Sequence, residues 1–165
     1  SEEGRHLGPV VNETQWGKIQ DLIQAGIDEG ARLVAGGTGR PEGLNKGFYV
    51  RPTVFADVTN DMTIAREEIF GPVLSIMKFD SEEGAIEVAN DTPYGLTNYV
   101  QTGDSDRANR LARQLRSGMV EMNGTSRGAG APFGGMKMSG NGREGGSWGL
   151  HDFVEVKSVS GWTPE

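Results

Sequence analysis

The amino-acid sequence predicts an α/β fold with a largely parallel sheet flanked by helices. Segments with apolar residues every three or four positions alternate along the chain with short runs of β-branched and aromatic residues. Helices of this length between strands are typical of right-handed crossovers, which place consecutive strands parallel. A chain of 165 residues has the usual size of one domain, and no change in composition marks a boundary inside it.

The first predicted helix begins near Asn12, whose side chain can cap the backbone together with Gln15 three residues later. Gly30 supplies a left-handed end to this helix. Residues 33–35 follow as a short strand that we expect to be buried. The apolar face of the helix is formed by Trp16, Ile19, Ile23 and Ile27.

Two further strands are predicted at residues 48–56 and 73–79. Pro52 interrupts the first of them, which favours an edge position because proline cannot donate to a ladder of hydrogen bonds. Asp80 or Ser81 is expected to cap the next helix, which then runs to the region of Asn90.

The second half of the chain repeats the alternation. A strand at residues 97–102 precedes a helix capped by Asp104, and strands are predicted again at 119–123 and 154–159. We expect the helix after Asp104 to bury a stripe formed by Ala108, Leu111, Ala112 and Leu115.

Charge and composition exclude several classes of function. A net charge of −7 argues against binding to nucleic acid or to anionic membranes, because both need clustered Lys and Arg. No apolar run approaches the ~20 residues that span a bilayer, and no signal leader is evident, so we expect a cytoplasmic protein. The chain has no cysteine, and its two histidines, His6 and His151, stand apart, so we expect no disulfide, thiolate or metal site.

Glycine is concentrated in one part of the chain. Ten of the 26 glycines lie between Gly124 and Gly149, which indicates a long, tightly folded loop system rather than a linker. The glycine-rich residues 36–40 lack the Gly-Lys-Ser/Thr ending of a phosphate-binding loop, so we interpret them as a surface turn.

Two adjacent carboxylates, Glu67 and Glu68, precede the strand predicted at residues 73–79. The simplest interpretation is a solvated surface pair. Alternatively, one carboxylate is fixed at a loop end and accepts two hydrogen bonds from a vicinal diol such as that of a ribose. Phe70 could then pack against a flat heteroaromatic ring, or it could be an ordinary core residue.

Five motifs, taken in order, resemble the aldehyde dehydrogenase superfamily, and the end of the chain at residues 156–162 resembles its bacterial members. The similarity extends from about Gly8 to Trp162. The motifs are Gly8-Pro9-Val10, Arg51-Pro52-Thr53-Val54, Glu67-Glu68-Ile69-Phe70-Gly71-Pro72-Val73, Asn90 through Tyr94-Gly95-Leu96, and Pro132-Phe133-Gly134-Gly135.

The resemblance implies a partial catalytic domain of an oxidoreductase that converts aldehydes to carboxylic acids with NAD or NADP. Residues 1–153 would be the C-terminal part of that domain. Residues 154–165 would be the strand and tail of an oligomerisation region, through which family members form homodimers or homotetramers. Arg143 matches a residue at the subunit interface.

The resemblance also implies roles for single residues. Glu68 would hold the hydroxyls of the nicotinamide ribose, and Phe70 would lie beside the nicotinamide. Phe133 would form an aromatic wall of the substrate pocket, and Asn123 would open the loop that anchors the aldehyde's tail. Glu144 would lie near the general base and pass protons outward.

The sequence departs from the family pattern in two respects. Residues 124–131 are small where many relatives have bulky aromatics, which suggests a roomier or more polar substrate, and Arg127 could pair with a substrate carboxylate or face solvent. The nucleophilic cysteine, the general base and the dinucleotide-binding domain lie upstream in the family, so we expect this chain alone to be inactive. The alternative is a non-catalytic interaction module that retains the fold.

Overall fold

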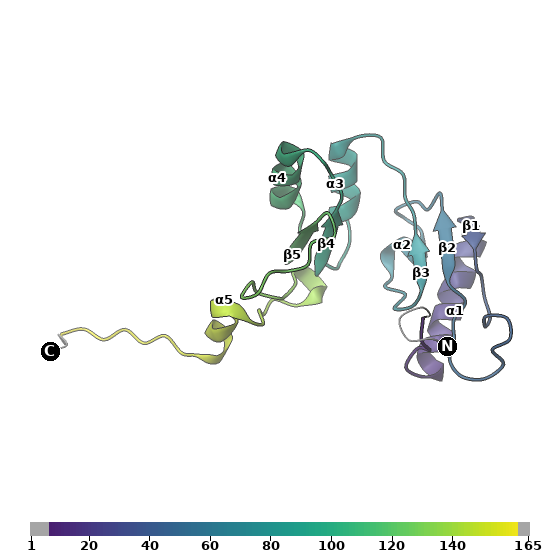
Figure 1. The fold of residues 1–165 in the computed structure, drawn as a ribbon, viewed down its shortest axis with the longest axis horizontal. Helices are drawn as coiled ribbons and strands as arrows, with labels where there is room; N and C mark the ends of the chain where they lie inside the picture. The colour runs from purple at the N-terminus through teal and green to yellow at the C-terminus, as the bar shows by residue number, and fades with distance from the viewer. Residues whose placement is uncertain (1–6, 162–165) are drawn as a thin grey trace. The chain divides into compact units, whose positions relative to one another are not determined.

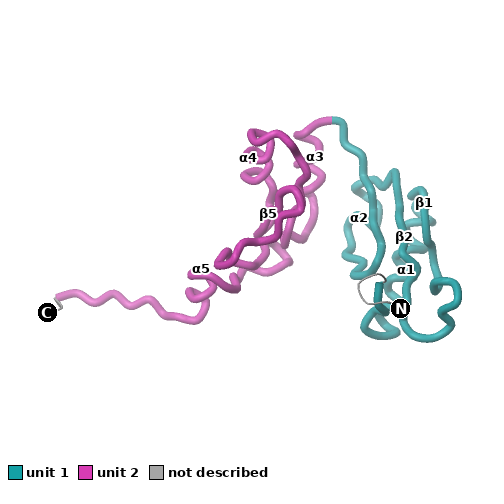
Figure 2. The backbone as a smooth tube through the Cα atoms, viewed as in Figure 1, with its two compact units in different colours: residues 1–80 teal, residues 81–165 magenta. Residues whose placement is uncertain are grey.

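The computed structural model describes residues 7–161, and these form two compact units that divide the chain after Asp80 (Figure 2). This division was not predicted from the sequence. His6 and Trp162 lie outside the described residues. The α/β class is confirmed, because helices flank two small sheets and two of the three strand pairings in the described part are parallel (Figure 1).

The first unit contains a three-stranded sheet and two helices. Its strands are β1 (Arg32–Ala35), β2 (Thr53–Ala56) and β3 (Val73–Ser75), in the order β1-β2-β3. β1 runs antiparallel to β2, whereas β3 runs parallel to it. The helices are α1 (Glu13–Asp28) and the single turn α2 (Thr63–Arg66).

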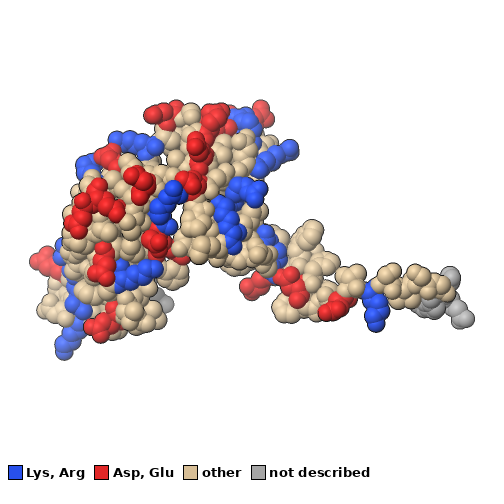
Figure 3. Space-filling model, turned by 180° about the vertical axis from the view of Figure 1, so that it is seen from behind, with Lys and Arg blue, Asp and Glu red and all other residues tan. Residues whose placement is uncertain are grey.

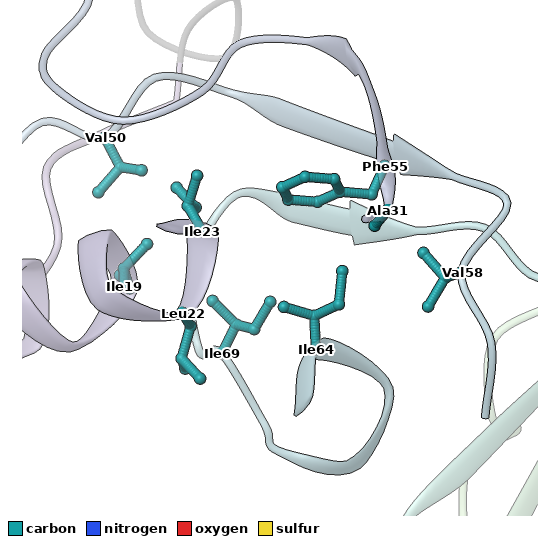
Figure 4. Packing of buried hydrophobic residues seen from close by; sticks show 9 residues of the cluster. All are labelled: Ile19, Leu22, Ile23, Ala31, Val50, Phe55, Val58, Ile64 and Ile69. Atoms are coloured by element: carbon teal, nitrogen blue, oxygen red, sulfur yellow. The ribbon is translucent and has the colours of Figure 1, made fainter. Parts of the chain in front are cut away.

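A hydrophobic core holds the first unit together, with side chains from α1, β2 and α2 meeting in one cluster (Figure 4). Phe55, Ile19 and Ile23 are fully buried, and each such side chain contributes about 1.5–3 kcal/mol when it is removed from water. The whole cluster is Ile19, Leu22, Ile23, Ala31, Val50, Phe55, Val58, Ile64 and Ile69.

Two local signals for α1, the Asn12 cap and the Gly30 end, are confirmed, but the second half of the capping box is not formed, because the Gln15 side chain donates to Ile69 and Phe70. The Asn12 side chain accepts a hydrogen bond from the Gln15 amide at 2.8 Å, and Gly30 adopts φ 89° immediately after the helix. Ile19 and Ile23 face the core, but Ile27, at the end of the expected face, is 36% exposed.

Three expectations for the strands of the first unit are wrong. β1 is exposed along its length, because it lies at the edge of the sheet. Pro52 does not mark an edge strand, because it directly precedes β2, which is central. The strand predicted at 73–79 is shorter than expected, because β3 ends at Ser75. One further bond continues the pairing, in which the Ile76 amide donates to the Phe55 carbonyl at 2.9 Å.

The second unit alternates helices and strands as expected. It contains α3 (Glu82–Asn90), β4 (Thr97–Val100), α4 (Ser105–Gln114) and β5 (Met119–Met122), and β4 pairs parallel with β5. A 3₁₀ turn η1 (Lys137–Ser139), a short helix α5 (Gly146–Leu150) and a second 3₁₀ turn η2 (His151–Phe153) follow within the glycine-rich region.

Side-chain caps begin both long helices of the second unit. The Ser81 hydroxyl accepts from the Gly84 amide, and the Asp104 carboxylate accepts from two amides in the first turn of α4. The stripe expected on α4 is only half-buried: Leu115 is 9% exposed, whereas Ala112 faces solvent. A two-stranded sheet offers little area to cover this face.

Ion pairs join α3 to α4. Glu82 lies 2.9 Å from Nε of Arg110 and 3.1 Å from Nε of Arg107. The hydrogen bonds from Arg110, and after them the one from Arg107, lower the pKa of Glu82 to about 2, so this carboxylate is ionised at neutral pH. Acidic and basic side chains intermingle in the same way over the face drawn in Figure 3.

The strand predicted at residues 154–159 is not formed. The described residues after η2 are exposed and have no ladder partner (Figure 1). A β-strand requires hydrogen bonds to a neighbouring strand, and the described residues after η2 make no such bonds within the described part of this chain. The domain bounds 1–153 and 154–165 remain a prediction.

Among residues 7–161, no helix is both long and apolar enough to cross a lipid bilayer.

Candidate functional site

The loop at residues 67–73 is fixed to the body of the first unit at three points. The Ile69 side chain is 8% exposed and belongs to the core cluster. Nε2 of Gln15 donates to the carbonyl oxygens of Ile69 at 3.0 Å and Phe70 at 3.3 Å. Gly71 lies against Ile19 so closely that a Cβ there would be 2.6 Å from Ile19 Cδ1. The loop therefore has little freedom where it carries its functional candidates.

Glu68 and Phe70 lie on either side of the buried Ile69 and are exposed. The Phe70 side chain is 72% exposed, and its backbone adopts φ 57°, a conformation that costs a side-chain-bearing residue about 1–2 kcal/mol. The Glu68 carboxylate makes no hydrogen bond or ion pair to any other described residue. A carboxylate with free acceptor sites beside an exposed ring fits a ligand that offers a diol and a flat heterocycle.

Asn123 directly follows β5 and extends the pairing of the two strands by one hydrogen bond. Its amide donates to the Val100 carbonyl at 2.7 Å. Its side chain accepts from the Thr102 amide at 2.8 Å and donates to the Thr102 carbonyl at 3.0 Å. With φ 52°, Asn123 turns the chain into the loop that follows. Both polar groups of this side chain are therefore engaged in the fold.

Phe133 and Glu144 are brought together by a two-residue antiparallel bridge. The Phe133 amide donates to the Glu144 carbonyl at 2.8 Å, and the Glu144 amide donates back at 2.7 Å. Both residues line an open hollow of about 670 Å³ that also includes Leu96 and Phe153. The sequence alone placed both residues in one site without indicating that they pair.

Arg127 is attached to the loop that carries Phe133. Nη1 of Arg127 donates to the carbonyl oxygen of Ala131. Its guanidinium lies 5.8 Å from the centre of the Phe133 ring, within range of a cation–π interaction. Arg127 and Asn123 line a second open hollow of about 640 Å³. The side chain is exposed, so solvent and a bound anion are both able to reach it.

Arg143 stabilises the glycine-rich loop through hydrogen bonds to the backbone of that loop. Its Nη1 donates to the carbonyl oxygens of Gly135 and Gly142 at 2.8 Å and of Asn141 at 3.2 Å, and its amide donates to Asp152 at 2.9 Å. These contacts give Arg143 a role within the chain. The subunit-interface role implied by the resemblance remains a prediction.

Several supporting residues were missed from the sequence. Gln15 signalled only a helix start, yet its side chain supports the loop that carries Glu68. The Gly95 amide donates to Ser139, and the Gly95 carbonyl accepts from the Gly118 and Met136 amides. The bond to Met136 brings Gly95 next to the end of the motif at residues 132–135, but nothing in the spacing of the two motifs predicts that contact.

Comparison with known proteins gives a consistent result. The model of the aldehyde dehydrogenase family matches residues 1–159. A 3-succinoylsemialdehyde-pyridine dehydrogenase from a Pseudomonas species is 50% identical over 157 residues, which is 95% of this chain and 33% of that protein.

Two crystal structures are also similar. An aldehyde dehydrogenase from Bartonella henselae matches with a TM-score of 0.94 and 58% identity, over 98% of this chain and 34% of that one. A mutant of aldehyde dehydrogenase C from Pseudomonas syringae, in complex with NAD+ and octanal, matches with a TM-score of 0.92 and 50% identity, over 96% of this chain and 33% of that one. This chain thus spans about a third of the length of these relatives.

Replacement of Asn123 tests its structural role. Asn123→Ala removes both side-chain hydrogen bonds to Thr102 and places alanine at φ 52°, so we expect the free energy of unfolding to fall by about 2–3 kcal/mol. Asn123→Gly loses the same bonds without the backbone strain and should lose about 1–2 kcal/mol. Urea denaturation measures both values. Unchanged stability in both variants would show that these hydrogen bonds do not stabilise the fold.

Proposed function

This chain belongs to the aldehyde dehydrogenase family, and from that premise we propose that it forms part of an enzyme that oxidises aldehydes to carboxylic acids with NAD+ or NADP+. In this proposal the chain contributes the grip on the nicotinamide ribose and part of the substrate wall. The related protein from Pseudomonas syringae was crystallised with NAD+ and octanal, which supports the pairing of a nicotinamide cofactor with an aldehyde substrate.

The observation that carries the proposal is the unpaired carboxylate of Glu68 on a loop that is fixed from behind. An ionised carboxylate is the natural acceptor for the two hydroxyls of a ribose. Because Gln15, Ile69 and Gly71 fix the backbone on both sides, little conformational entropy is lost when the diol binds. The exposed Phe70 ring next to it would limit where the nicotinamide can lie.

When bound, the nicotinamide accepts a hydride from the substrate carbon. The chain's own residues would orient and enclose the reactants. Phe133 would cover the apolar part of the aldehyde, and Asn123 would set the direction of the loop that contacts its tail. Glu144, exposed at the rim of the same hollow as Phe133, would carry protons between the site and solvent.

The chain contains no cysteine, so it cannot supply the thiolate with which the family attacks the aldehyde carbon. We therefore expect no formation of NADH when this chain alone is mixed with an aldehyde and NAD+. Losing one such catalytic group typically costs factors of about 10²–10⁴, and the family's general base is missing as well. Absorbance of NADH measures the reaction, with the full-length protein as the positive control. Turnover by the purified chain would contradict the proposal.

Replacing the acid at position 68 tests the ribose grip in the full-length protein. Glu68→Gln keeps the size of the side chain but removes its charge and one acceptor, so kcat/KM for the cofactor should fall about ten- to a hundredfold. The matched control is Glu67→Gln, the same substitution one residue earlier on the same exposed loop. Both variants should unfold at the same urea concentration as the parent. Equal values of kcat/KM for the cofactor in the two variants would show that Glu68 does not hold the ribose.

Arg127 is proposed to select aldehydes that carry a carboxylate. Arg127→Gln should lower kcat/KM about tenfold for an aldehyde acid and leave an uncharged aldehyde of equal length unaffected. Arg127→Lys keeps the charge but loses the bidentate geometry. Its kcat/KM for the aldehyde acid should therefore lie between that of the parent and that of Arg127→Gln. Steady-state kinetics with the substrate pair measures the ratio. An equal loss for both substrates would mean that Arg127 acts through its contacts to Ala131 and Phe133.

We also propose that residues 154–165 extend a sheet of a neighbouring subunit in a homodimer or homotetramer. Their support is the unpaired backbone of the described residues 154–161 and the exposure of Val156, which reaches 93%. If the full-length protein sediments as the same oligomer after residues 154–165 are removed, these residues do not join the subunits.

A further inference from the structure

Asparagine is followed by glycine at two positions, Asn123-Gly124 and Asn141-Gly142. In such a pair the glycine amide nitrogen can attack the side-chain carbonyl carbon of the asparagine. The new C–N bond closes a five-membered succinimide, and ammonia leaves. Water then opens the ring to aspartate or isoaspartate, so the reaction needs no oxidant or other partner. Glycine favours the attack because it has no side chain to block it.

The structure treats the two pairs differently. At Asn123 both atoms that must move are restrained: Oδ1 accepts from the Thr102 amide, and Nδ2, the leaving group, donates to the Thr102 carbonyl. These two bonds, of 2.8 Å and 3.0 Å, have to break before the side chain can turn toward Gly124. The fold therefore protects this asparagine.

At Asn141 the side chain is exposed and makes no hydrogen bond to another described residue. The Gly142 amide, which would be the nucleophile, likewise has no acceptor among the described residues. Only the carbonyl oxygens of this pair are held, both by Nη1 of Arg143. Those contacts fix the backbone near the reacting atoms and leave the side chain free to turn.

We propose that Asn141 is a site of spontaneous deamidation in the folded protein and that Asn123 is protected. The product carries a new negative charge two residues from Arg143, on the loop that also holds Asp152 against the Arg143 amide. Isoaspartate in addition lengthens the main chain by one methylene. The lengthened segment lies between Phe133 and Glu144, whose backbones pair at 2.8 Å and 2.7 Å.

The test compares the two sites within one sample. Purified protein is incubated in mildly alkaline buffer and digested, and the peptides containing residues 123 and 141 are quantified by mass spectrometry for Asn, Asp and isoaspartate. In the native state we expect Asn141 to convert about ten- to a hundredfold faster than Asn123, as follows from two hydrogen bonds that must break at Asn123. In concentrated urea the two rates should approach each other, because both pairs have the same local sequence chemistry.

A variant gives the matched control. In Gly142→Ala the new methyl group lies 3.2 Å from Oδ2 of Asp152, which has to shift by a few tenths of an ångström while it accepts from the Arg143 amide, and residue 142 has no left-handed backbone. Conversion at Asn141 should slow strongly, while that at Asn123 stays unchanged. Equal native rates at the two sites, or faster conversion of Asn123, would overturn the proposal. That comparison uses the parent protein alone, so it holds even if the variant folds poorly.

Discussion

The burial of Ile69 is the constraint on which the cofactor side of the candidate site depends. The Ile69 side chain packs into the core, and the left-handed backbone of Phe70, with φ 57°, turns the chain directly after it. Ile69 is 8% exposed and contacts the core, which leaves Glu68 and Phe70 facing outward. The position of the two candidate ligand contacts thus follows from the packing of a residue that touches no ligand.

The glycines have a comparable role in the second unit, where large buried side chains are scarce. A Cβ on Gly118 would lie 1.8 Å from the Gly134 carbonyl oxygen, and one on Gly135 would lie 2.9 Å from the Ser139 carbonyl oxygen. At these positions backbone packs directly on backbone, which only glycine allows. The glycine-rich region is therefore a packed loop system, as its density in the sequence indicated, and it fixes the backbone on which Phe133 and Glu144 pair.

The parts of the fold that the sequence predicted are those with local causes. The caps at Asn12, Ser81 and Asp104 depend on atoms within three residues of each other, so their patterns can be recognised without knowing the fold. Burial depends instead on neighbours that are distant in sequence. The exposure of β1 and the central place of β2 follow from strand order, which hydrophobic pattern alone does not specify.

The candidate site shows the same difference between local signals, which the sequence carries, and distant contacts, which it does not. Glu68, Phe70, Phe133 and Glu144 were nominated through motifs, but the contacts that hold them in place were not. Gln15 illustrates why: its backbone amide makes the expected local cap, while its side chain reaches 54 residues along the chain to Ile69. A residue that serves both a local and a distant contact carries only the local signal in the sequence.

Arg127 combines a fixed position with unused binding capacity, and this is the argument for its proposed role in substrate choice. A guanidinium has five N–H donors, and the bond from Nη1 to Ala131 leaves the others available for an anion. The Phe133 ring at 5.8 Å restricts where the charged group can lie without neutralising it. Because the residues around it at 124–131 are small, a carboxylate could approach without displacing a bulky side chain. In the proposed function, an anchored cation beside an open loop would favour a polar, acidic substrate tail over a purely apolar one.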